Sequence, residues 1–255
     1  MSAASLSVFE VGSVRERFAI AGDVYENSPR KMLAGGWHRV MSSQDVPETQ
    51  RGGFYGALYK RTLNGKDQYV IAFRGMDGLR DLDDVARLML GGAPEQLKDA
   101  YKFAKEAMIQ HNIDPADVEY VGHSMGGYLS KAVGLMLDSP KIYSFNGPGL
   151  FERDLKALPR QIMREFGENK ADITESRVLE RVLSVNSKWD PVSWLGKLTG
   201  RTVSIETEGR PHKLSSLERN FSRAAAGLSN VAPTPVASLV LPALNRGLTL
   251  AIPQV

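Results

Sequence analysis

Residues 121–127 read Val-Gly-His-Ser-Met-Gly-Gly and contain the pattern Gly-x-Ser-x-Gly centred on Ser124. A short apolar run, 118–121, precedes the pattern, and a stretch of good helix formers, 128–137, follows it. This strand–turn–helix context holds a serine nucleophile on a sharp turn. Gly122 and Gly126 remove side chains that would clash across such a turn, and the following helix directs N–H groups toward a developing oxyanion. The stretch therefore predicts a nucleophilic serine at the carboxyl end of a strand.

The composition is ordinary for a soluble globular protein. The 255 residues suffice for one large α/β domain or two small ones, with 42% hydrophobic and 24% charged residues. The net charge of +3 is small and the basic residues are scattered, so no nucleic-acid partner is expected, although weak attraction to anionic lipid is allowed. Because cysteine is absent, disulfides, thiolate catalysis and zinc–cysteine sites are excluded.

The N-terminal residues give an expectation about location. Residues 1–11 lack a basic stretch followed by an apolar run, so we expect no classical signal peptide. No apolar segment is long enough to span a bilayer. We therefore expect a protein that is cytoplasmic or is exported by a route independent of a signal peptide.

Strand-like and helix-like segments alternate along the chain. Asn64-Gly65, the preferred pair for a type I′ turn, predicts a β-hairpin, whereas residues 37–51 are polar and irregular. The alternation predicts an α/β protein with a mostly parallel, doubly wound sheet and helices on both faces. Right-handed crossovers place the loops after the strands at one rim. The expected helices are 14–25, 94–108, 128–137 and 151–168, and the expected strands are 54–61, 68–73, 118–121, 141–145, 182–186 and 202–205.

A serine hydroxyl is a weak nucleophile near neutral pH and needs an adjacent base. The chain has four histidines. His123 is next to the serine and should point away from it, while His38 and His111 precede the pattern in sequence. His212 alone follows it, in a loop after a predicted strand, where this fold class supplies its base. We therefore predict His212 as the general base.

The base needs a carboxylate that fixes its tautomer, and Asp190 is the best candidate. It follows the strand predicted at 182–186 and gives the chain order serine, aspartate, histidine. The alternative is that Asp190 is only a structural helix cap, because aspartate followed by proline is also a common helix start. Asp172 is a weaker rival because residues 172–175 look like a capping box. Two further aspartates, Asp138 and Asp154, lie at a helix end and a helix start, which are the wrong places for this carboxylate.

A tetrahedral intermediate needs two N–H donors for its oxyanion. The backbone amide of Met125, the residue after the nucleophile, should be one of them. The second should come from the strand end at 73–75, which makes the amide of Met76 its natural supplier.

These residues together resemble the class 3 lipase family, and its bacterial members in particular. The resemblance covers residues 18–221 and implies an α/β-hydrolase fold acting on lipid esters. It assigns Ser124 as nucleophile, Asp190 as orienting acid and His212 as base, and it implies no cofactor and no metal. One departure is Met76, because the family usually has Ser or Thr there, whose hydroxyl also supports the oxyanion. The motifs, in order, are Ala-Phe-Arg-Gly-Met-Asp at 72–77, the turn at 122–127, Phe-Asn-Gly-Pro-Gly at 145–149, Asp-Pro-Val at 190–192, and His212.

Two segments lie outside these motifs. Residues 76–90 have an amphipathic pattern that suits either a mobile lid, as the family often has there, or an ordinary packed helix. Residues 224–255 have Arg246 as their only charged side chain and contain four prolines. We therefore expect a catalytic domain at 1–223 and an apolar C-terminal segment at 224–255 that covers its own domain, a protein partner or a lipid surface.

The expected activity is serine carboxylic-ester hydrolysis of the lipase or phospholipase type. The alternatives are a thioesterase or small-ester esterase on the same machinery, and a non-catalytic binding protein that keeps the fold. The expected partners are a lipid ester, transient contact with a lipid interface, and an inhibitor-like or immunity-like protein at the C-terminal segment or the site rim. The resemblance also permits a bacterial effector role, because bacterial lipases without signal peptides include antibacterial effectors exported by contractile secretion machines.

Overall fold

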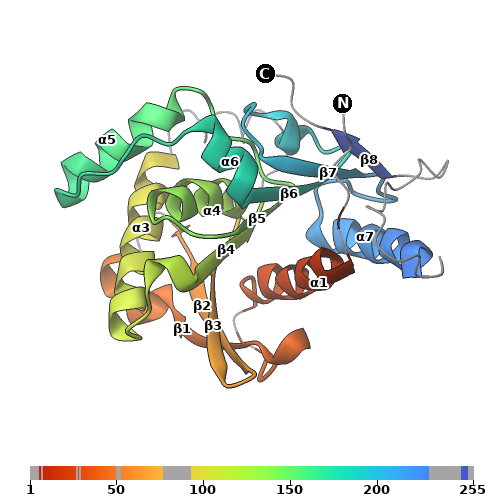
Figure 1. Ribbon diagram of the computed structural model, residues 1–255, viewed down its shortest axis with the longest axis horizontal. Coiled ribbons are helices and arrows are strands. Elements are labelled where there is room, and N and C mark those ends of the chain that lie inside the picture. The colour runs from red at the N-terminus through yellow and green to blue at the C-terminus, as the bar shows by residue number, and fades with distance from the viewer. Residues whose placement is uncertain are drawn as a thin grey trace.

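An eight-stranded sheet runs through the molecule in the sequential order β1 to β8 (Figure 1). The computed structural model describes residues 8–26, 30–49, 53–76, 93–229 and 248–251, together with Leu6 and Ser28. Strands β3 to β7 are parallel, and antiparallel β1, β2 and β8 extend the two edges. The strands are β1 His38–Ser42, β2 Gly56–Leu63, β3 Lys66–Phe73, β4 Val118–His123, β5 Ile142–Phe145, β6 Val182–Ser187, β7 Arg201–Ile205 and β8 Leu248–Ala251.

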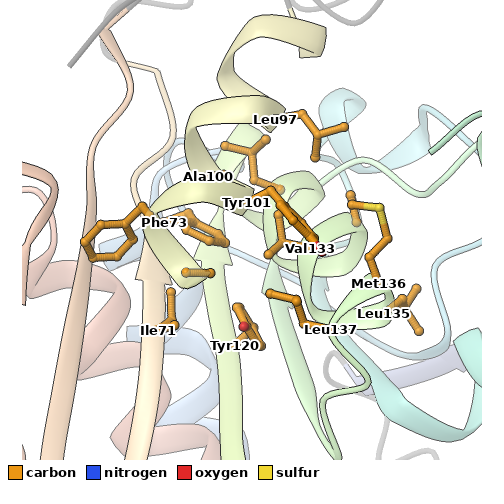
Figure 2. Close-up of a cluster of buried hydrophobic side chains, with 14 of the residues drawn as sticks. Ile71, Phe73, Leu97, Ala100, Tyr101, Tyr120, Val133, Leu135, Met136 and Leu137 are labelled. Atoms are coloured by element: carbon orange, nitrogen blue, oxygen red, sulfur yellow. The ribbon is translucent and has the colours of Figure 1, made fainter. Parts of the chain in front are cut away.

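Helices cover both faces of this sheet, and each face has its own apolar core (Figure 1). Helices α3 to α6 pack on one face, while α1 and α7 pack on the other. Figure 2 shows apolar side chains of α3 and α4 meeting those of β3 and β4. This arrangement confirms the predicted α/β-hydrolase class with its mostly parallel sheet. The helices are α1 Val8–Asp23, α3 Ala93–Gln110, α4 Met125–Met136, α5 Asp154–Phe166, α6 Glu175–Arg181 and α7 Leu214–Ser229.

Helix α4 lies at the centre of the fold. Every one of its residues is buried, and it contacts β3, β4, β5 and α3. A helix packed on all sides cannot shift easily, because protein interiors are as dense as organic crystals. The residue at its N-terminus, Ser124, is therefore held by a rigid element.

The β-hairpin is confirmed, since Asn64 and Gly65 have the positive φ angles, 53° and 74°, that a type I′ turn requires. The expectation for residues 37–51 was wrong, because β1 forms there. A register shift between Arg39 and Met41 breaks the apolar alternation that would have revealed this strand. Helix α1 begins at Val8, earlier than predicted.

Helix α7 was not predicted, although Leu217, Phe221 and Ala225 repeat at helical spacing and are all buried. The boundary expected between residues 223 and 224 falls inside this helix. Near the C-terminus, β8 pairs with β7. Within the described residues, no helix combines the length and apolar character needed to cross a membrane.

Candidate active site

The turn between β4 and α4 holds Ser124 in an uncommon backbone conformation, with φ 57° and ψ −128°. Such a conformation costs on the order of 1–3 kcal/mol and persists only where the surroundings enforce it. A Cβ atom on Gly122 would overlap the carbonyl oxygen of Gly126, and one on Gly126 would overlap that of Phe73. The Ser124 amide donates to the carbonyl of Phe145 at 3.0 Å. Both glycines are thus required by close backbone approach, as the sequence pattern predicts.

Three side chains from separate parts of the sequence form a hydrogen-bonded row. His212 Nε2 lies 2.9 Å from Ser124 Oγ, and His212 Nδ1 lies 3.0 Å from Asp190 Oδ1. The side chain of Asp190 is fully buried, whereas that of His212 is 30% exposed. A histidine placed between a buried carboxylate and a serine hydroxyl can accept the hydroxyl proton and release it again, which is the geometry of general-base activation.

Asp190 also matches the alternative interpretation made from the sequence. It is the N-cap of η6 (Pro191–Trp194), and its Oδ1 accepts a hydrogen bond from the Val192 amide at 3.2 Å. The cap fixes the carboxylate, and the same oxygen faces His212. One aspartate therefore both caps the turn and hydrogen-bonds to the histidine.

The rival carboxylates lie elsewhere. Asp138 binds the guanidinium groups of Arg177 and Arg181, and Asp154 accepts from the Tyr128 hydroxyl. The capping box expected at Asp172 was wrong, because Thr174 is the N-cap of α6. His38 lies in the edge strand β1, and His111 follows the end of α3.

The two residues predicted for the oxyanion hole flank the serine. Met125 is the first residue of α4, so its amide is one of the N–H groups that a helix start leaves without an internal acceptor. A Cβ atom on Gly75 would come within 3.0 Å of Ser124 Cβ, which places the loop before Met76 against the nucleophile. Within the described part of the chain, neither the Met76 amide nor the Met125 amide donates a hydrogen bond, so both are available to an oxyanion. The rest of the amphipathic segment, residues 77–90, lies outside the described residues.

Asn146 supports the site from the end of β5. Its Oδ1 accepts from the Ser187 amide at 2.7 Å, and its Nδ2 donates to the Pro211 carbonyl at 2.8 Å. It therefore connects the end of the strand that leads to Asp190 with the loop that carries His212. The sequence motif at 145–149 indicates a supporting role, but the partners of Asn146 are distant in sequence and visible only in the fold. Among the described residues, no group of three metal-ligating side chains comes together.

Residues 17–234 match a sequence family described as the Tle-like phospholipase domain. The chain belongs to this family. The matched region contains Ser124, Asp190 and His212 and most of the described sheet. This Tle-like phospholipase domain is therefore a lipase- or phospholipase-like hydrolase, which is the broader part of what the class 3 lipase resemblance implies.

Several solved structures have a similar backbone. Extracellular lipase LipA from Serratia marcescens has 16% identity and a TM-score of 0.39, over 75% of this chain and 41% of that lipase. This chain thus spans less than half of the Serratia lipase. The Rhizomucor miehei lipase has 12% identity and a TM-score of 0.47, over 80% of this chain and 69% of its own. The metagenomic carboxylesterase EstE1 has 16% identity and a TM-score of 0.36, over 88% and 98%. No curated protein matches the sequence.

Proposed function

We propose that this chain hydrolyses carboxylic esters of lipids, as a lipase or phospholipase, through a catalytic triad of Ser124, His212 and Asp190. The observation that carries the proposal is the hydrogen-bonded row from Asp190 Oδ1 through His212 to Ser124 Oγ. The narrower placement in the class 3 lipases is part of the same proposal and rests on the sequence motifs.

In the first half of the reaction, Ser124 Oγ attacks the ester carbonyl carbon and His212 Nε2 takes the hydroxyl proton. The oxyanion accepts hydrogen bonds from the amides of Met76 and Met125, and the N-terminal end of α4 adds its positive dipole. His212 then protonates the departing alcohol, which leaves an acyl group on Ser124. Asp190, hydrogen-bonded to Nδ1, stabilises the imidazolium that exists between these proton transfers.

In the second half, His212 removes a proton from water, which attacks the acyl group. The resulting tetrahedral intermediate uses the same two amides, and His212 returns its proton to Ser124 as the fatty acid leaves. The side chain of His212 is partly exposed while that of Asp190 is buried, which is consistent with water reaching the imidazole in this step.

Two tryptophans beside the acid suit a lipid surface. Trp189 precedes Asp190, and Trp194 ends the turn that Asp190 caps; they are 58% and 63% exposed. Exposed tryptophans are unusual in solution but common at membrane–water interfaces, where the ring enters the apolar layer and its N–H stays hydrated. They support transient contact of this rim with a lipid interface.

A protein partner and a bacterial effector role also belong to the proposal. An inhibitor-like or immunity-like protein that covers the rim at Trp189 and Trp194 would block lipid access to Ser124. Its support is the exposure of these two side chains beside Asp190.

The test combines a serine-directed phosphonate probe with mass spectrometry of products from mixed phospholipids and triglycerides. We expect the probe to label the wild type and not Ser124→Ala, and we expect free fatty acids from one of the lipid classes. Absence of label and of product in the wild type would favour the non-catalytic alternative. Cleavage confined to thioesters or water-soluble esters would favour the other enzymatic alternative.

The interface has a separate test. Trp189→Ala combined with Trp194→Ala should lower hydrolysis of liposomal lipid about tenfold, which corresponds to about 1.4 kcal/mol of lost attraction, and leave a short soluble ester unaffected. The matched control is Met32→Ala combined with Ile109→Ala, because these apolar residues are also exposed but are not neighbours of Asp190 in the sequence. An equal loss in the control pair would contradict a specific lipid-facing rim.

A further inference from the structure

His123, directly before the nucleophile, makes two side-chain hydrogen bonds that the reaction described above does not use. Its Nε2 lies 2.8 Å from the backbone oxygen of His212, and its Nδ1 lies 3.0 Å from the hydroxyl of Tyr25. The imidazole is buried, and its ring centroid is 5.0 Å from that of His212. The Tyr25 hydroxyl in turn lies 2.9 Å from the Gly75 amide.

These contacts restrict where the protons lie. The His212 carbonyl can only accept, so His123 Nε2 carries a proton. Burial, together with the nearby His212, lowers the pKa of His123 to about 3, so the ring is neutral and its Nδ1 carries no proton. A nitrogen without a proton can only accept, so the Tyr25 hydroxyl donates to Nδ1, while the Tyr25 oxygen accepts from the Gly75 amide.

The chain of contacts joins the two loops that face Ser124. At one end is Gly75, next to the proposed oxyanion donor Met76, and at the other is the backbone of the proposed base. With the Gly75 amide bound to Tyr25, the Met76 amide is the one left in this loop without an acceptor among the described residues.

We propose that His123 is a positioning residue that, together with Tyr25, sets the distance between the oxyanion-side loop at 74–76 and the His212 loop. The inference rests on the proposed ester hydrolysis. It complements Asn146, which holds the preceding carbonyl, that of Pro211. Two neighbouring carbonyls of the base loop are thus held by side chains from the ends of β4 and β5. Neutrality also matters, because a charged ring beside His212 would oppose the imidazolium that forms during the reaction.

The activity test uses Tyr25→Phe, with Tyr120→Phe as the matched control. Tyr120 is buried, and its hydroxyl has no hydrogen-bond partner within the described residues. Phosphonate titration counts competent sites, so that kcat is expressed per active Ser124. We expect Tyr25→Phe to lower kcat on a short ester about tenfold with little change in KM, because small displacements of reacting groups are costly. The control should retain wild-type kcat.

The histidine itself is tested by a pair of variants. His123→Phe keeps a ring but loses both hydrogen bonds, and we expect kcat to fall about 100-fold. His123→Gln places an amide N–H where it can reach the His212 carbonyl, and it should recover part of that loss. Wild-type kcat per titrated site in both Tyr25→Phe and His123→Phe would overturn the inference. If His123→Phe does not fold, Tyr25→Phe alone decides.

A readout independent of turnover is NMR of protein labelled with ¹⁵N-histidine. We expect His123 to show the neutral tautomer protonated at Nε2 throughout pH 5 to 9, with its resonances shifted in Tyr25→Phe and not in Tyr120→Phe. A His123 that titrates in this range, or carries its proton on Nδ1, would overturn the inference. Failure of the wild type to cleave any ester would instead remove the proposed function, and the NMR result would then decide the hydrogen-bond assignment alone.

Discussion

Two buried aspartates in this molecule have opposite surroundings. Asp23, at the end of α1, accepts hydrogen bonds from Arg39 at 2.8 Å, from the Tyr59 hydroxyl at 2.9 Å and from the Arg30 amide at 3.1 Å, so both of its oxygens are occupied. Asp190 uses Oδ1 for His212 and Val192, while Oδ2 has no hydrogen-bond partner in the described part of the chain.

The partners of the two carboxylates differ in chemistry. Arg39 stays charged at any working pH and has no proton to transfer, and burial raises the pKa of Tyr59, so its hydroxyl remains a donor. The two side-chain partners of Asp23 therefore act only as hydrogen-bond donors. His212 can bind or release a proton and faces a hydroxyl. A carboxylate whose two oxygens both have hydrogen-bond partners, one of them arginine, is typical of a structural ion pair. A carboxylate with one unpartnered oxygen, next to a histidine that contacts a serine hydroxyl, is typical of a catalytic site.

The largest loss of activity should come from substituting Asp190 or either of the two residues in its hydrogen-bonded row. Ser124→Ala, Asp190→Ala and His212→Ala should each lower kcat for ester hydrolysis on the order of 10³-fold or more, with melting temperatures close to that of the wild type. The measurements are steady-state kinetics and thermal unfolding. Normal turnover in a folded His212→Ala variant would show that His212 is not the general base, and His38 and His111 would be the next candidates.

Substitution of Asp23 should have the opposite outcome, namely a large loss of stability with a small loss of activity. Asp23→Ala leaves Arg39 charged and buried without its carboxylate, so the free energy of unfolding should fall by about 3–5 kcal/mol. Turnover per titrated active site should change less than tenfold. The control is Asp67→Ala, which breaks the exposed pair with Lys60 and should leave the free energy of unfolding nearly unchanged, because solvent screens exposed ion pairs. Equal losses in denaturant unfolding would contradict the assignment of Asp23 as a buried structural pair.

The oxyanion-side loop at 74–76 extends the comparison from side chains to backbone amides. Met76→Ala should keep most activity, whereas Met76→Pro, which deletes the amide, should lose on the order of 10²-fold in kcat. Circular dichroism establishes that both variants are folded. Equal damage from alanine and proline would mean that the side chain matters and that the backbone amide is not the donor.

Lys131 is a third buried ionisable group, and it has no carboxylate partner in the described residues. Its Nζ donates to the carbonyls of Gly147 and Pro148, and burial lowers its pKa from 10.5 to about 7. The folded state thus holds fewer protons than the unfolded state between about pH 7 and pH 10.5. In this window the Lys131 contribution to stability should rise with pH, by at most about 1.4 kcal/mol per unit, and it should be level below pH 7.

The Lys131 prediction is measured as unfolding free energy at pH 7 and pH 9. Lys131→Met should remove part of the rise, while Lys98→Met, at a partly exposed site, should leave it in place. An identical pH dependence in the wild type and Lys131→Met would show that the amine is charged in the folded protein.

Much of this site could be predicted because its signals are local. The turn at 121–127 requires glycines for steric reasons, and chain order reduces four histidines to one. The partners of Asn146, Tyr25 and His123 could not be predicted, because they lie 41 to 98 residues away in the sequence. The strand β1 was missed for a different reason, namely the irregular register that disrupts its alternation.

The smallest effect should come from the C-terminal strand. β8 pairs antiparallel with β7, from Thr202 opposite Ala251 to Ile205 opposite Leu248. Deleting residues 230–255 removes this pairing and leaves β7 as an edge, so we expect a loss of about 1–2 kcal/mol and a melting temperature lower by a few degrees. Hydrolysis of a soluble ester should persist, because Ser124, Asp190 and His212 lie upstream.

A shorter form that ends at residue 221 is the matched comparison. It cuts α7 within its buried face and removes Ala225, so its melting temperature should fall further than that of the form ending at residue 229. The order of the two melting temperatures separates the contribution of α7 from that of β8. An unchanged melting temperature in the 230–255 deletion, together with lost liposome binding, would mean that the C-terminal segment serves a lipid surface rather than its own sheet.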